Sequence, residues 1–345
     1  MQSIKKNGFG LLVCIGVAVP AWFLGRLVPV AGAPVVALLI GMGLTLIWKN
    51  KGSADAGIKF ASKKILQWAV VLLGAGLNYT VVLRTGMQSL PIIVCTIGAS
   101  LLAAFLLYKT LRLSSTSAML IGIGSSICGG SAVAAAASVI DADSEDAAQA
   151  ISVIFFFNVL AALIFPPLGQ ALGFSTQSGE AFGIFAGTAV NDTSSVTAAA
   201  AAWDTMWNLG TQTLDKAVTV KLTRTLAIIP ITFALAFLRM KQLKHAGRTE
   251  KSVRLTAIFP FFILYFIAAS IITAVLSNFG VAPSFFAPVK TLSKFFITIA
   301  MAAVGLNSNI ITLIKTGGKP LFLGACCWLV ITCVSLVMQR VMGIW

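Results

Sequence analysis

Long apolar runs alternate with short polar stretches along almost the whole chain. The runs are continuous and do not alternate residue by residue, so they differ from the strands of a transmembrane β-barrel. A helix needs about 20 mainly apolar residues to cross a bilayer, so each run predicts one transmembrane helix. The eleven runs are 9–27, 33–48, 64–83, 89–107, 117–139, 148–172, 181–203, 215–238, 255–277, 287–310 and 319–342. The polar breaks between them include 50–52, 84–86, 241–254 and 316–320.

The composition narrows the class of protein to an all-α polytopic membrane protein. Of the 345 residues, 58% are hydrophobic and 10% are charged. An ordinary soluble domain has about 45–50% apolar and about 25% charged residues, so a soluble or disordered chain is excluded. No polar stretch is long enough for an extramembrane domain.

The formal net charge is +15, and the positive residues gather in some loops more than in others. Lysine and arginine accumulate in cytoplasmic loops. A cytoplasmic N-terminus places 17 of the 25 inside and five outside. This distribution predicts a multi-pass protein with a cytoplasmic N-terminus. The first apolar run is rather long for a signal peptide and no clear cleavage site follows it closely, so we expect it to be retained as an uncleaved span. Because these charges sit in short loops, no nucleic-acid partner is expected.

The residue inventory argues against several kinds of chemistry. The chain has one histidine, His245, in a basic loop, and its six cysteines lie within apolar runs. A histidine metal site or a Ser-His-Asp triad inside the membrane is therefore not expected. The chain has no Walker motif, so it does not drive transport with ATP by itself. We expect no enzyme activity, no cofactor and no metal.

The span count suggests an internal duplication. After an extra N-terminal helix, 1–32, two blocks of five segments, 33–175 and 176–345, would be inverted repeats, as in many secondary transporters. Two local likenesses do not fit that offset. Residues 73–78 resemble 302–307, and 131–136 resemble 194–199. We interpret both as similar packing through small residues.

The segment 117–139 is rich in glycine and serine at mid-membrane, which is poor for an uninterrupted helix. A broken helix presents half-helix N-termini that suit an anion. A continuous helix packed through its small residues is the alternative. The candidate substrate-binding residues of this segment are Ser125, Ser126, Cys128, Gly129, Gly130 and Ser131.

The segment 181–203 carries a polar run with one carboxylate, Asp192. An ionisable residue inside the membrane is costly and by default a functional candidate. Asp192 could carry a proton, coordinate sodium or pair with a basic residue, and the alternative is a loop at the membrane edge. Asn191, Thr193 and Ser194 are the neighbouring candidates for substrate binding.

Lys221 and Arg224 share one face of the segment 215–238. We expect Lys221 to extend its amine outward. The planar fork of Arg224 suits an oxyanion, or could form a structural pair with Asp192. Asn307 is a further substrate-binding candidate, and Asn158 is another amide within a span. Either amide could complete a polar cavity or hydrogen-bond between helices.

These motifs, in this order, resemble the YeiH family of bacterial inner-membrane proteins, which are named as sulfate exporters and related to cation/proton antiporters and bile-acid and arsenite carriers. The resemblance implies a panel domain and a core domain, with discontinuous helices at 117–139 and 287–310 that cross at mid-membrane. It also implies elevator-like or rocking alternating access. Carriers of that type are often dimers, so a homodimer is expected by analogy.

The leading expectation is a secondary active transporter of a small anion, with export of sulfate or a related oxyanion or sulfonate. Its partners would be the anion, a proton or sodium ion coupled through Asp192, and the lipid bilayer. A sodium-coupled uptake carrier for a small organic acid and an anion channel are the alternatives.

Overall fold

The computed structural model describes residues 2–27, 32–48, 50–75, 79–245, 261–279, 281–308 and 318–345. Every regular element in these ranges is a helix, which confirms the all-α class. The elements are α1 (Gln2–Leu27), α2 (Gly32–Ile47), η1 (Gly52–Ala54), α3 (Asp55–Phe60), η2 (Ala61–Ile65), α4 (Leu66–Gly74), α5 (Tyr79–Leu111), α6 (Ser115–Ser126), α7 (Gly130–Ile140), α8 (Ser144–Ala171), α9 (Glu180–Ala189), α10 (Thr193–Trp207), α11 (Gln212–Thr225), α12 (Ile228–His245), α13 (Phe261–Asn278), η4 (Pro283–Phe286), α14 (Ala287–Asn307) and α16 (Gly318–Val341).

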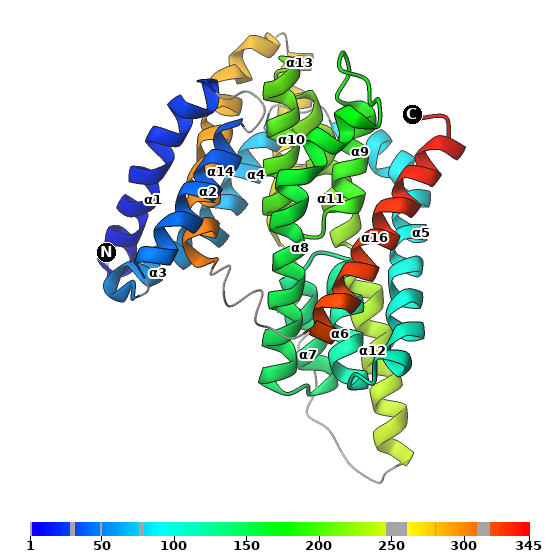
Figure 1. The fold of residues 1–345 in the computed structure, drawn as a ribbon. Coiled ribbons are helices and arrows are strands. Elements are labelled where there is room, and N and C mark those ends of the chain that lie inside the picture. Colours follow the sequence, from blue (N-terminus) through cyan, green and yellow to red (C-terminus); the bar gives the residue numbers. More distant parts are fainter. Residues whose placement is uncertain are drawn as a thin grey trace.

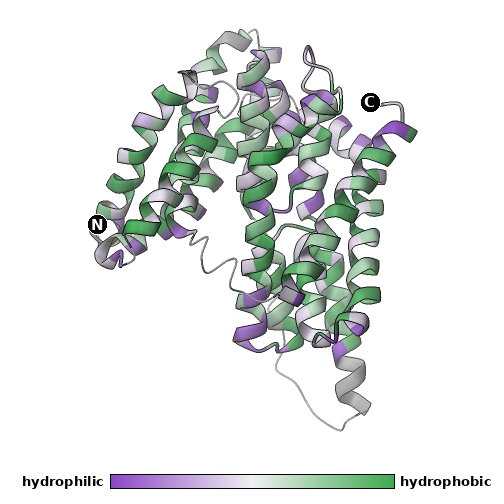
Figure 2. Ribbon diagram, in the orientation of Figure 1, coloured by the Kyte–Doolittle hydropathy of each residue, from purple (hydrophilic) through white to green (hydrophobic). Residues whose placement is uncertain are grey.

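The helices have the length and surface of a membrane protein. Within the described residues, 7 helical stretches are long and apolar enough to cross a bilayer. Many large apolar side chains are exposed, among them Ile47, Met87 and Phe105. Hydrophobic residues make up most of the length of these helices (Figure 2). A soluble monomer rarely exposes such continuous apolar surface, so lipid covers it here. Eleven crossings remain a prediction.

The boundaries of several predicted segments change in the structure. The break expected at 84–86 is helical, because it lies within α5, which continues for 33 residues from Tyr79. Pro91 lies inside α5, which a membrane helix tolerates when its neighbours satisfy the freed carbonyl. The segments 117–139 and 181–203 each divide into two short helices, α6 with α7 and α9 with α10.

The helices pack into two units (Figure 1). The small unit contains α1 to α4, α13 and α14, and the large unit contains α5 to α12 and α16. Most helix contacts lie within one unit. The short helix α10 belongs to the large unit but also packs against α2 and α14. It is therefore the main bridge between the two units.

The small unit is held together where α2 and α14 cross with their backbones in contact. A methyl group on Gly41 would lie 2.6 Å from the Ala302 carbonyl oxygen. One on Gly305 would lie only 2.2 Å from the Leu38 carbonyl oxygen. The Thr45 hydroxyl donates to the Leu306 carbonyl at 2.7 Å beside this crossing. Small residues permit such close approach in membranes, where packing stabilises helix association.

We expect Gly41→Ala to destabilise the protein by about 1–3 kcal/mol, because its methyl group must push α2 away from α14. Gly43→Ala on the same helix is the control, since nothing lies within 4 Å of a methyl group there. Thermal unfolding in detergent should show a lower midpoint for Gly41→Ala and an unchanged or higher midpoint for Gly43→Ala. Equal midpoints for the two variants would contradict the close crossing.

Candidate functional site

Two helical hairpins form the centre of the large unit. Helices α6 and α7 contact each other, as do α9 and α10. In Figure 1 the α6–α7 pair lies at the lower end of the unit and the α9–α10 pair at the upper end. The first hairpin turns at residues 127–129, where Gly129 has a φ of +73° that a side chain would disfavour. The second turns at 190–192.

The structure describes part of the expected pair of interrupted helices. The break in 117–139 is present. In 287–310, α14 ends at Asn307, and residues 309–317 lie outside the described part of the chain, so the crossing of these two segments stays a prediction. A further break lies in 181–203. The physical reason is the cap at Asp192, whose carboxylate accepts a hydrogen bond from the Ser195 N–H and so begins a new helix.

Two buried cations on α11 hold the first halves of both hairpins. Lys221 and Arg224 are each 0% exposed. The Lys221 amine donates to the carbonyl oxygens of Ile127 at 2.7 Å and Val190 at 3.1 Å. These carbonyls lie at the C-terminal ends of α6 and α9, where no partner exists within the helix and partial negative charge accumulates.

Arg224 donates hydrogen bonds to carbonyls at the same two helix ends through all three nitrogens of its guanidinium. Its Nε donates to the Ser126 carbonyl at 2.8 Å, and Nη2 donates to the Ser125 carbonyl at 2.8 Å. On the other hairpin, Nη1 donates to the Thr188 carbonyl at 2.6 Å. Nη2 also reaches the Asn191 amide oxygen at 3.5 Å. One side chain thus fixes both breaks at a common point.

The contacts of the two cations differ from the sequence expectations. Lys221 does not extend toward the surface, because its amine is bonded to the two breaks. The ion pairs among the described residues do not include one between Arg224 and Asp192. The arginine is used instead to satisfy backbone carbonyls.

The second halves of the hairpins present their N-termini at the same place. Asp192 caps α10 and also accepts a hydrogen bond from the Ser194 hydroxyl. A methyl group on Gly129 would lie 3.3 Å from Asp192 Cβ, so the two turns touch. Beside them the Cys128 thiol lies 2.9 Å from the Ser131 hydroxyl.

Asn158 on α8 joins the two turns and was not among the sequence candidates for substrate binding. Its amide oxygen accepts a hydrogen bond from the Asn191 N–H at 3.0 Å. A methyl group on Gly129 would lie 3.5 Å from its Nδ2. The only sequence signal was an amide within a long apolar run, which many interhelical hydrogen bonds also produce.

The site has a buried side and an accessible side. Lys221, Arg224 and Asn191 are buried, whereas Gly130, Asp192 and Thr193 are partly exposed and Ser131 is exposed. The exposed part of the two turns therefore lies at the N-termini of α7 and α10, and the two cations lie on the buried side. All of the predicted site residues gather here except Asn307. It ends α14 in the small unit, where its amide donates to the Ser62 hydroxyl at 3.4 Å.

The two hairpins share a sequence offset of 63 residues. Ser131 and Ser194, which begin similar stretches, are 63 residues apart. The carbonyls of Ser125 and Thr188 have the same separation and both bind Arg224. Those of Ile127 and Val190 both bind Lys221. The likeness that the sequence suggested to be local packing therefore coincides with equivalent contacts in the structure.

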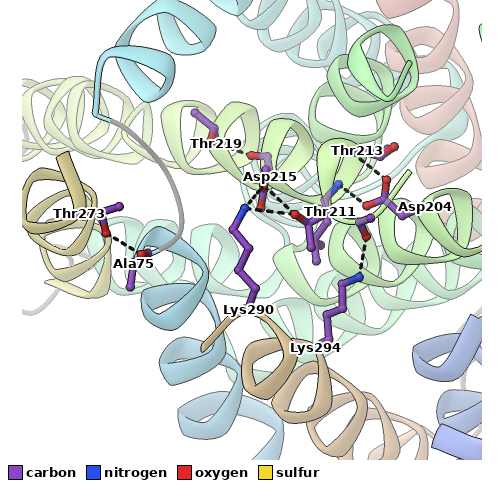
Figure 3. A network of polar contacts seen from close by, with 11 residues as sticks. Ala75, Asp204, Thr211, Thr213, Asp215, Thr219, Thr273, Lys290 and Lys294 are labelled. Carbon is purple, nitrogen blue, oxygen red and sulfur yellow. Dashed lines mark hydrogen bonds and ion pairs between the residues drawn. The ribbon is translucent and has the colours of Figure 1, made fainter. Parts of the chain in front are cut away.

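A second polar cluster connects the large unit to the small one (Figure 3). Asp204 on α10 accepts hydrogen bonds from the N–H groups of Thr213 and Leu214, both at 2.9 Å, and so caps α11. Asp215 forms an ion pair with Lys290 of α14 at 2.9 Å. Lys294, one turn further on, donates to the Gly210 carbonyl at 2.6 Å. With two aspartates and two lysines, this cluster is balanced in charge.

Together, the lipid-facing helices and the paired hairpins define an all-helical membrane protein with an internal polar site. A family model described as "Conserved hypothetical protein 698" matches residues 9–324, and the chain belongs to this family.

Similar proteins cover nearly the full length of the chain. A "UPF0324 membrane protein" from Streptococcus mutans is 58% identical over 337 residues, which is 97% of each chain. Another, from Fusobacterium nucleatum, is 52% identical over 347 aligned positions, covering 97% of this chain and 98% of the other. Their names state that they are membrane proteins and nothing more.

Replacing Arg224 should unfold the junction of the two hairpins. We expect Arg224→Met to cost roughly 3 kcal/mol or more, because several buried carbonyls lose their donor. Lys216→Met on the same helix is the control. Its partner Glu180 is half exposed, and a pair of this kind contributes less than about 1 kcal/mol.

Thermal unfolding in detergent compares the two variants, with size-exclusion chromatography as the check on folding. A small shift of similar size for both variants would show that Arg224 does not hold the hairpins.

Proposed function

We propose that this protein is a secondary active transporter of a small anion, with export of sulfate or a related oxyanion or sulfonate as the leading case. Coupling to a proton or sodium ion would pass through Asp192. The observation that supports this function best is the junction of two interrupted helices beside two buried cations and one accessible carboxylate.

The junction suits an anion for electrostatic reasons. Helix N-termini carry free N–H groups and partial positive charge, which favour anions. Those of α7 and α10 lie on the accessible side of the site, and Lys221 and Arg224 lie behind them. Interrupted helices at membrane depth occur where backbone is buried in protein or lines a cavity, as it does in transporters.

Asp192 supports coupling to a cation. It is the acidic side chain at the hairpin turns, and it is partly exposed. Its carboxylate could accept a proton or share a sodium ion with nearby hydroxyl oxygens such as that of Ser194. Ionisable residues in this setting are typical of ion pathways and proton relays.

The division into two units supports alternating access. Contacts between the units are concentrated at α10 and at the Lys290 and Lys294 bonds to the α10–α11 region. Such a limited polar interface could be remade when one unit moves against the other. A sodium-coupled uptake carrier for a small organic acid fits the same site, and an anion channel is the less favoured alternative.

The decisive assay is flux of labelled sulfate into proteoliposomes under imposed pH or sodium gradients. We expect saturable, gradient-dependent flux from the wild-type protein and loss of the gradient dependence in Asp192→Asn. Asparagine caps a helix about as well as aspartate, so the fold should be kept. Asp143→Asn is the matched control, because Asp143 is an exposed N-cap residue whose side chain makes no capping bond.

Full gradient-driven flux in Asp192→Asn would make this carboxylate structural. Flux that rises without saturation would favour the channel. If sulfate is not carried, the same assay with sulfite, sulfonates and short carboxylates follows, and failure of all of them would overturn the proposed function.

A further inference from the structure

The charges at the hairpin turns do not balance. Lys221 and Arg224 contribute two positive charges, and both are buried. Of the described acidic side chains, Asp192 alone interacts electrostatically with Lys221. The partial charges of the helix ends cancel, because two C-termini and two N-termini meet there. With Lys221, Arg224 and Asp192 all ionised, the turns therefore carry one unmatched positive charge.

The two helix N-termini differ at one equivalent position. The 63-residue offset pairs Gly129, at the start of α7, with Asp192, at the start of α10. Asp192 places a carboxylate on its helix, whereas α7 has no side-chain cap. The Ala132 N–H bonds to the Gly129 carbonyl, so the N–H groups without a partner within α7 are those of Gly130 and Ser131. The position on α7 that is equivalent to that of the Asp192 carboxylate on α10 thus lies beside Gly129, and it lacks a negative charge.

Two buried side-chain amides lie at the turns. The buried Asn191 is 1% exposed, and its Nδ2 has no hydrogen-bond partner among the described residues. The Nδ2 of Asn158, a side chain that is also 1% exposed, lies beside Gly129. An unpaired buried donor is costly, so a bound acceptor would stabilise this arrangement.

We propose that the anionic group of the substrate binds at the N-terminus of α7, in the place equivalent to that of the Asp192 carboxylate on α10, and that a divalent anion binds only when Asp192 takes up a proton. The proposal rests on the proposed function and identifies the anion site within it. Its donors are the N–H groups of Gly130 and Ser131 and the Asn158 amide. The Ser131 hydroxyl, which donates to the Cys128 carbonyl at 3.2 Å, would turn to the bound anion.

The coupling follows from the charge count. A monovalent anion neutralises the single unmatched charge, so it binds without a proton. A divalent anion leaves an excess negative charge, which a proton from the buffer on Asp192 removes.

The charged groups on the elements around Asp192 agree with the count of one unmatched positive charge. Helix α2 has no ionisable residue. Helix α8 contributes the neutral Asn158, and its acidic residues Glu145 and Asp146 lie in its first turn, about three helical turns away from Asn158. Cys128 is the remaining titratable group at the turns. Lys290 and Lys294 of α14 are matched by Asp204 and Asp215 at the far end of α10. On α9, Glu180 is paired with Lys216.

The test is calorimetric titration of the purified full chain in detergent with sulfate and with methanesulfonate, in two buffers of different ionisation enthalpy. The buffer dependence gives the number of protons taken up on binding. We expect about one proton per sulfate and about none per methanesulfonate, by the charge balance above. In Asp192→Asn, sulfate should bind without proton uptake.

A second variant tests the position. Asn158→Asp keeps the acceptor for the Asn191 N–H but adds a fixed negative charge beside Gly129, so both anions should bind roughly tenfold or more weakly. Asn208→Asp, at the exposed end of α10, is the control and should bind as the wild type does. Ser131→Ala, which changes an exposed side chain, should weaken binding without altering the fold.

The outcomes separate the two claims. Sulfate binding without proton uptake, uptake that persists in Asp192→Asn, or unchanged affinity in Asn158→Asp would each overturn this inference while leaving an anion carrier standing. If neither anion binds to the folded wild-type protein, the site fails together with the sulfate or sulfonate function.

Discussion

The large unit depends on the hydrogen bonds that Lys221 and Arg224 make to the ends of α6 and α9. Two helices that stop inside a membrane protein leave carbonyl groups without partners, and each such group is costly where water is absent. Two buried cations would be costly as well. These two costs offset each other here, because the carbonyl oxygens accept hydrogen bonds from the amine and the guanidinium at 2.6–3.1 Å. The fold thereby keeps two full charges next to two accessible helix N-termini.

Much of this could be predicted from the sequence. The apolar runs gave the all-helical membrane class, since no other structure can bury them. The glycine and serine residues before Ser131 indicated a break, and the polar run at Asp192 indicated another special segment. Both predictions identified residues that now meet at one site. They succeeded because polar residues inside long apolar runs need a local structural reason.

The rest depended on how the segments meet in space. The sequence shows that Lys221 and Arg224 share a helix face, but not that the partners of that face are backbone carbonyls. Every residue has a backbone carbonyl, so the sequence does not show which carbonyls these two side chains bind. The span count suggested a long repeat that pairs 117–139 with 287–310, whereas the equivalent contacts to Lys221 and Arg224 follow the shorter offset of 63. The sequence did not identify Asn158 as a site residue, because its role depends on a hydrogen bond to a turn 33 residues further along the chain.

The use of backbone carbonyls has a consequence for divergence within the family. A cation that binds carbonyl oxygens tolerates many side chains at the residues that supply them. Ser125, Ser126 and Val190 could therefore change while Lys221 and Arg224 kept both hairpins in place. The more exposed residues Gly130, Ser131 and Thr193 do not supply these carbonyls. Relatives with the same architecture can in this way acquire different ligand preferences without rebuilding the scaffold that holds them.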